Sequence, residues 1–132
     1  MSAVVDASLL VAATTDEGPE GRWAEEVLRA GSLVAPHLAL VEATNIVRRF
    51  ELSGQLSRIE AGAAARDLLL LDIELVPFTP FAERVWELRH NVTSYDAWYV
   101  AVAEQLDLPL ATLDRNLAAA SGPRCRFLLL PL

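Results

Sequence analysis

Four carboxylates that lie far apart in the sequence could do chemistry if the fold brings them together: Asp6, Glu42, Asp96 and Asp114. The first and the last follow short apolar runs, and Asp96 opens an otherwise almost entirely apolar helical stretch. Several carboxylates in one half-buried place repel one another, and a divalent cation removes that cost. Mg²⁺ and Mn²⁺ prefer such hard oxygen ligands. The chemistry that this set predicts is metal-assisted hydrolysis, in which the metal makes a bound water nucleophilic near neutral pH.

Each of these carboxylates also has a structural explanation. Asp6, Asp96 and Asp114 could each cap the helix that follows, and Glu42 could belong to a solvated helix face. For any one residue alone, the structural explanation is the commoner case. The neighbouring sequence favours a site, because nothing basic lies near Asp6 or Asp96 and only Arg115 adjoins Asp114.

Other reactive residues are scarce and isolated. His37 and His90 are lone histidines, so no zinc site is expected. Cys125 is the single cysteine, which excludes an intrachain disulfide and suits the reducing cytoplasm. Asp6 interrupts the first apolar run, which argues against a secretory signal, and no apolar stretch approaches the ~18 residues of a membrane span. We expect a cytoplasmic protein with no membrane association and a single domain over residues 1–132.

The charge pattern limits how the chain can bind nucleic acid. The formal net charge of −7 argues against a general nucleic-acid coat, which needs clustered cationic residues. It leaves room for an enzyme whose positive charge comes from bound metal. Arg49 shares a predicted helix face with Glu42 and Asn45, so it is a candidate RNA phosphate contact or, equally, an exposed solvated arginine.

Short apolar runs alternate with longer helical patterns, which predicts a parallel sheet covered by helices on both faces. Pro36 and Pro80 are each expected to open a helix, and Ser57 with Glu60 has the spacing of a capping box. Ligands in such sheets bind beyond the carboxyl ends of strands, where strand order reverses, which is the place expected for the first and last carboxylates. The predicted strands cover residues 3–5, 33–35, 73–78, 110–112 and 126–130. The predicted helices cover residues 8–13, 19–29, 36–52, 57–71, 80–90, 95–106 and 115–120.

Segments of this chain resemble the motifs of PIN domains. In chain order they are Val4–Ser8, Glu42–Asn45, Thr93–Ala103 and Leu110–Leu117. The third is the most specific, because a Tyr-Asp-Ala start is followed by an apolar helix. The resemblance implies an α/β, PIN-like three-layer fold with an about five-stranded parallel sheet flanked by helices. In that fold the strands that end at Asp6 and Asp114 are neighbours.

The same resemblance implies roles for individual residues. The catalytic and metal-binding acids would be Asp6, Glu42, Asp96 and Asp114. Ser8 and Thr112 match hydroxyl positions that support the metal shell in the family. Family members often carry a further acid two residues after the fourth one, and here that place holds Asn116, a neutral oxygen ligand at best. The cofactor implied is Mg²⁺ or Mn²⁺, with a weakened second metal position.

The length of the chain and the lack of appended domains resemble the VapC toxins of VapBC toxin–antitoxin pairs. This implies a metal-dependent endoribonuclease that leaves a 5′-phosphate on structured RNA such as tRNA or rRNA. It also implies a homodimer and a cognate VapB-like antitoxin, an arginine of which would replace the metal charge in the site. Candidate contacts for these partners, although core packing is the commoner role for such residues, are Trp23, Phe50, Trp86 and Trp98.

Three other functions stay open. A phosphatase or phosphotransferase on a related sheet typically needs a second Asp two residues after the first, and here that residue is Ser8. A catalytically weak PIN-like binding or scaffold protein is compatible with Asn116 and with the acidic net charge. A nuclease acting on DNA is also compatible, because nothing in these residues selects the sugar.

Overall fold

The computed structural model describes residues 2–132 and contains one parallel sheet. Its strands are β1 (Ala3–Val5), β2 (Leu33–Pro36), β3 (Ile73–Val76), β4 (Leu110–Ala111) and β5 (Phe127–Leu128). Its helices are α1 (Ala7–Thr15), α2 (Pro19–Arg29), α3 (Ala39–Leu52), α4 (Arg58–Leu70), α5 (Ala82–Glu87), α6 (Ser94–Leu106) and α7 (Arg115–Ala119), with a 3₁₀ turn, η1 (Thr79–Phe81), before α5. No helix among these residues is long and apolar enough to span a membrane.

The strand order in the sheet is β3-β2-β1-β4-β5. From β1 the chain moves outward through β2 to β3, and it then returns to β4 on the other side of β1. The order therefore reverses between β1 and β4, which pair in parallel with Val5 opposite Ala111. Asp6 and Asp114 follow these two strands, so their predicted neighbouring positions are confirmed. Open α/β sheets bind their ligands at such a reversal.

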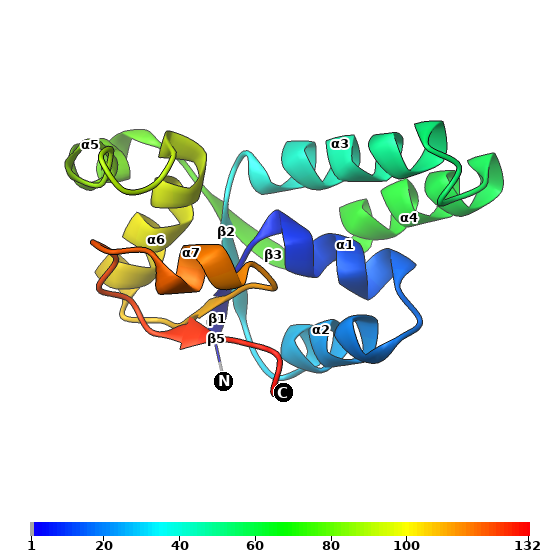
Figure 1. Ribbon diagram of the computed structural model, residues 1–132, viewed down its shortest axis with the longest axis horizontal. Helices are drawn as coiled ribbons and strands as arrows, with labels where there is room; N and C mark the ends of the chain where they lie inside the picture. The colour runs from blue at the N-terminus through cyan, green and yellow to red at the C-terminus, as the bar shows by residue number, and fades with distance from the viewer. Residues whose placement is uncertain (1) are drawn as a thin grey trace.

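Helices cover the sheet on both sides, which confirms the predicted fold class. Figure 1 shows α5 and α6 on one side and α1 to α4 on the other. α1 packs against α2, α3 and α4, while α6 packs against β1, β2 and β4. The apolar segment Ala97–Ala103 of α6 is buried throughout, because this helix lies between the sheet and α5. β1 and β2 are buried along their length, as expected of central parallel strands.

Pro36 does not open a helix, so this prediction was wrong. Pro36 is the last residue of β2, in register with Val76 of β3, and α3 begins only at Ala39. The next residue, His37, extends the pairing by donating its N–H to the Val76 carbonyl at 2.9 Å. A proline at the end of a strand and one at the start of a helix give the same local signal, and the pairing with β3 decides between them.

Other element boundaries differ from the predictions by a few residues. β3 ends at Val76 because Pro77 follows and has no N–H to continue a ladder. Pro80 lies in η1 instead of opening α5, and α5 is shorter than predicted. The predicted capping box is confirmed: the Ser57 hydroxyl accepts the Glu60 N–H at 3.1 Å, and the Glu60 carboxylate accepts the Ser57 N–H at 2.8 Å.

Gly21 allows α2 to approach the end of α1 closely. A Cβ atom at this position would lie 1.7 Å from the backbone oxygen of Asp16, so a side chain fits only if backbone moves. We expect Gly21→Ala to lower the free energy of unfolding by about 1–3 kcal/mol, the usual cost of overpacking. Urea unfolding measures this change.

Gly62, inside α4, provides the matched control for this prediction. A Cβ atom there would meet only an Arg66 side-chain nitrogen, at 3.8 Å. Gly62→Ala should therefore stabilise the protein by roughly 0.5–1 kcal/mol, because alanine loses less conformational freedom than glycine in a helix. Equal stabilities of the two variants would contradict the close approach of α2 to α1.

Candidate active site

Asp6 is the buried centre of the candidate site. It is the N-cap of α1, and its Oδ1 accepts hydrogen bonds from the Leu9 N–H at 3.1 Å and from the Ser8 hydroxyl at 2.6 Å. Its Oδ2 accepts a short hydrogen bond from the Thr112 hydroxyl. Asp6 is 7% exposed. The carboxylate is thus held rigidly, and by neutral donors.

Thr112 and Ser8 tie the end of β1 to the end of β4. Thr112 is fully buried, and its hydroxyl oxygen also accepts the Asp114 N–H at 2.9 Å. The Ser8 hydroxyl oxygen accepts the Leu113 N–H at 3.3 Å. Asp114 is the N-cap of α7, and its Oδ1 accepts the backbone N–H groups of Asn116 and Leu117, as expected of an N-cap. The structure therefore brings Asp6, Ser8, Thr112 and Asp114 together.

Asp96 lies in the first turn of α6 but does not cap it. The N-cap is Thr93, whose hydroxyl oxygen accepts the Asp96 N–H at 3.2 Å. The cap explanation is thus confirmed for Asp6 and Asp114 and wrong for Asp96. The half-buried Asp96 carboxylate has no capping function in α6, which leaves it available to the site.

Glu42, in the first turn of α3, is held by a residue that the sequence analysis missed. The Tyr99 hydroxyl, on α6, donates a hydrogen bond to Glu42 Oε1 at 2.7 Å. Tyr99 is buried, and burial together with the Glu42 charge raises the pKa of its hydroxyl, which keeps it protonated. The sequence feature that could have indicated Tyr99 is its spacing from Asp96. Tyr99 follows Asp96 by three residues and so lies on the same face of the helix.

The carboxylates form one electrostatically coupled group. Burial raises the pKa of Asp6, and the charge of Asp96 raises it further. Burial also raises the pKa of Glu42, with added contributions from Asp96 and Asp6. The pKa of Asp96 is raised by burial and then by the charge of Asp114. No arginine within residues 2–132 forms an ion pair with any member of the group, so its negative charge is not neutralised there.

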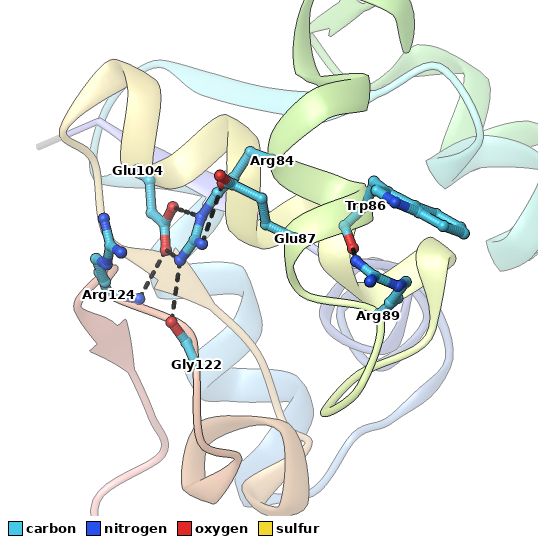
Figure 2. Close-up of polar contacts among 7 residues, drawn as sticks. All are labelled: Arg84, Trp86, Glu87, Arg89, Glu104, Gly122 and Arg124. Atoms are coloured by element: carbon cyan, nitrogen blue, oxygen red, sulfur yellow. Dashed lines mark hydrogen bonds and ion pairs between the residues drawn. The ribbon is translucent and has the colours of Figure 1, made fainter.

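Glu104, at the other end of α6, shows how this fold accommodates a paired acid (Figure 2). Arg84 of α5 donates to both of its oxygens, at 2.7 and 3.1 Å, and the Arg124 N–H donates at 2.7 Å. Although burial raises the pKa of Glu104, these partners together lower it. Arg84 also donates to the Gly122 carbonyl at 3.0 Å, so the cluster fastens the segment before β5 to α5 and α6.

The donor set fits Mg²⁺ or Mn²⁺, because every candidate ligand atom is an oxygen. Within residues 2–132, no three acidic, histidine or cysteine side chains form a ready-made metal cage. Mg²⁺ does not require one, since it usually keeps several waters and binds through one or two carboxylates. The charge of Asp96 raises the pKa values of both Asp6 and Glu42, so a cation bound between these carboxylates would reduce their repulsion.

Two further candidates, Arg49 and Asn116, lie at the surface. Arg49 is exposed on α3, and its role as an RNA contact stays a prediction. Asn116 is exposed, and its backbone N–H donates to Asp114 Oδ1 at 2.9 Å. Arg115 donates to the Leu130 carbonyl and forms no ion pair with Asp114.

The aromatic residues expected as partner contacts divide into two kinds. Trp98 is buried, and Trp23 and Phe50 are partly buried against the core, which matches their alternative explanation as packing residues. Trp86 is 67% exposed, and the Arg89 guanidinium lies 4.4 Å from the centre of its ring (Figure 2). Of these four residues, Trp86 presents the most ring surface to a partner.

We expect Asp6→Asn to fold and to be at least as stable as the parent at pH 7 in EDTA. The substitution removes one repelling, buried charge. An amide oxygen in place of Oδ1 can still accept the Leu9 N–H and the Ser8 hydroxyl, and the Thr112 hydroxyl can turn to accept from the amide nitrogen. Thermal unfolding measures the difference, and Asp72→Asn, at an exposed loop position, is the control.

The stability that Asp6→Asn gains over the parent should decrease as the pH falls. Because the pKa of Asp6 is raised in the folded protein, the parent gains stability as the pH falls through that pKa. The advantage of Asp6→Asn should therefore shrink as the pH is lowered from 7 through that raised pKa. A variant clearly less stable than the parent at pH 7 would show that Asp6 acts as a stabilising cap and not as an uncompensated charge.

Comparison with known proteins agrees with this geometry. The PIN domain family model matches residues 3–123. Ribonuclease VapC1 of Mycobacterium tuberculosis is 42% identical over 123 residues, which are 92% of this chain and 92% of that protein. The crystal structure of Mycobacterium tuberculosis VapC20, described as a Sarcin-Ricin loop cleaving toxin, is similar with a TM-score of 0.67 at 19% identity, covering 90% of this chain and 94% of that one. VapBC2 from Rickettsia felis, solved bound to a DNA fragment from its promoter, gives a TM-score of 0.67 at 14% identity over 99% of this chain and 100% of that one. The chain therefore belongs to the PIN domain family, and within it is similar to VapC ribonucleases.

Proposed function

We propose that this protein is a metal-dependent endoribonuclease toxin that hydrolyses phosphodiester bonds in structured RNA, such as tRNA or rRNA. The observation that carries the proposal is the group of coupled carboxylates, without a paired cation in the described chain, at the reversal of strand order. The 42% identity to a VapC ribonuclease over 92% of the chain supports the same reaction class. The cytoplasm, where its RNA substrates are found, is the proposed location.

The residues that would hold Mg²⁺ or Mn²⁺ are Asp6, Asp96 and Asp114, with Glu42 as a direct ligand or as the group that orients the attacking water. When bound, the ion supplies a nucleophilic water near neutral pH and stabilises charge on the phosphate. The Asp6 carboxylate has a fixed position, since both of its oxygens are already oriented by hydrogen bonds. Burial raises the pKa of Glu42, which makes its carboxylate a stronger base toward the attacking water.

Asn116 limits the charge of the site. It stands two residues after Asp114 and offers a neutral oxygen at best, so a second ion would bind more weakly than the first. The same residue supports the second candidate function, a binding or scaffold protein with a weakened site. Ser8, by contrast, argues against an aspartyl phosphotransferase, because its hydroxyl donates to Asp6 where that reaction would need a second acid.

A cognate VapB-like antitoxin is the proposed protein partner, together with a second copy of this chain. The uncompensated carboxylates would accept an arginine from the antitoxin, whose guanidinium can donate two parallel hydrogen bonds to one carboxylate. Such an arginine would replace the charge of the metal and so block the site. Arg49, exposed on the same helix as Glu42, is proposed to contact RNA phosphate.

Cleavage of total RNA by the purified, antitoxin-free protein tests the proposed function. We expect discrete cuts in Mg²⁺ or Mn²⁺, none in EDTA, and a loss of rate of about 100-fold or more in Asp96→Asn, since even indirect supports of a metal site cost 10–100-fold. Asp67→Asn, an exposed helical aspartate on α4, is the matched control and should cut at the parental rate.

The other outcomes separate the candidates. No cleavage, together with no rise in melting temperature on addition of Mg²⁺ or Mn²⁺, would favour the scaffold protein. Cleavage that persists in EDTA, or in Asp96→Asn at the parental rate, would contradict the proposed site.

A further inference from the structure

Glu42 differs from Asp6 and Asp114 in how it is held. Asp6 and Asp114 each accept backbone N–H groups, as N-caps do. The Glu42 carboxylate, at the end of a longer and more flexible side chain, accepts one hydrogen bond within residues 2–132, from the Tyr99 hydroxyl at 2.7 Å. A carboxylate only accepts, so the phenol is the donor.

The Tyr99 side chain is itself fixed. It is 3% exposed, on a segment of α6 that is buried between the sheet and α5. It lies three residues after Asp96, so the helix that presents Asp96 to the site also presents the phenol to Glu42. The hydrogen bond occupies Oε1 and leaves Oε2 without a hydrogen-bond donor among the described residues. One oxygen of Glu42 is thereby anchored while the other stays available.

We infer that Tyr99 is a positioning residue that orients Glu42 toward Asp6 and Asp96 and so sets the affinity of the site for a divalent cation. This inference rests on the proposed function. Without the hydroxyl, Glu42 can turn toward solvent and away from the like charges of Asp6 and Asp96. The Glu42 carboxylate would then no longer be oriented for a cation before the cation binds. Residues that orient the ligands of a metal site typically change its affinity by about 10–100-fold.

A purely structural role for Tyr99 makes a different prediction. The same hydrogen bond joins α3 to α6, so its loss could lower stability without changing cation binding. The two roles separate in a double-mutant cycle with Glu42→Gln. If Tyr99 acts through Glu42, Tyr99→Phe should weaken cation binding in the parent and have little further effect in the Glu42→Gln background.

The experiment measures the Kd for Mn²⁺, by electron paramagnetic resonance of the free ion, in the parent, Tyr99→Phe, Glu42→Gln and the double variant. We expect Tyr99→Phe to raise the Kd roughly 10-fold. Tyr95→Phe is the matched control, because the chain has two tyrosines and Tyr95 is exposed on the same helix. It should bind Mn²⁺ like the parent.

Each outcome has a distinct meaning. An unchanged Kd in Tyr99→Phe, with normal binding by the parent, would overturn the inference and leave the proposed function intact. Equal losses from Tyr99→Phe in both backgrounds would also overturn it, since Tyr99 would then act independently of Glu42. Failure of the parent to bind Mn²⁺ would overturn the metal-dependent function and the inference with it.

A measurement on the parent chain covers the case in which Tyr99→Phe does not fold. With ¹³C at the tyrosine Cζ position, the protein gives two resonances, which Tyr95→Phe assigns. Saturation with Mg²⁺ should shift the Tyr99 resonance more than that of Tyr95, because the charge on the carboxylate that accepts its hydrogen bond changes. A Tyr99 resonance that does not move at saturating Mg²⁺ would overturn the inference.

Discussion

Burial of three charged carboxylates, Asp6, Glu42 and Asp96, is the main electrostatic cost in this fold, and the charges of neighbouring carboxylates add to it. Burial, with a further contribution from neighbouring carboxylates, raises the pKa values of Asp6, Glu42 and Asp96, so their ionisation at neutral pH lowers the stability of the folded chain. Neutral hydroxyl and backbone donors hold Asp6 in place without removing its charge. An arrangement that costs stability in the isolated chain, and that a bound cation would relieve, is typical of a functional site.

The fold gathers the carboxylates that carry this electrostatic cost at one edge of the sheet. The adjacency of β1 and β4 brings two carboxylates to the same edge of the sheet, and α6, buried against that sheet, carries Asp96 and Tyr99 to it. At the far end of α6, the ion pair of Glu104 with Arg84 neutralises an acid that has no part in the site (Figure 2). The same helix therefore carries a paired acid at one end and an uncompensated one at the other.

The sequence predicts the sheet and the positions of Asp6 and Asp114 because a strand, its end and the following cap are local patterns. It fails where a tertiary contact decides: Pro36 ends a strand because β3 lies beside it. The support that Tyr99 gives to Glu42 joins residues 57 positions apart and leaves no local trace except helical spacing. The hydroxyl of Thr112 could be assigned to the site by resemblance, whereas its bond to Asp6 becomes visible only in the structure.

The most direct test of the central claim is a pH titration of the side-chain carboxyl groups by ¹³C NMR, with EDTA and then with saturating Mg²⁺. We expect Asp6, Glu42 and Asp96 to titrate above the ordinary range of their residue types in EDTA, and we expect Mg²⁺ to lower all three pKa values together. Exposed carboxyls on α4 should not respond to Mg²⁺. Ordinary pKa values for the three residues in EDTA, unchanged by Mg²⁺, would contradict a shared cation-binding site.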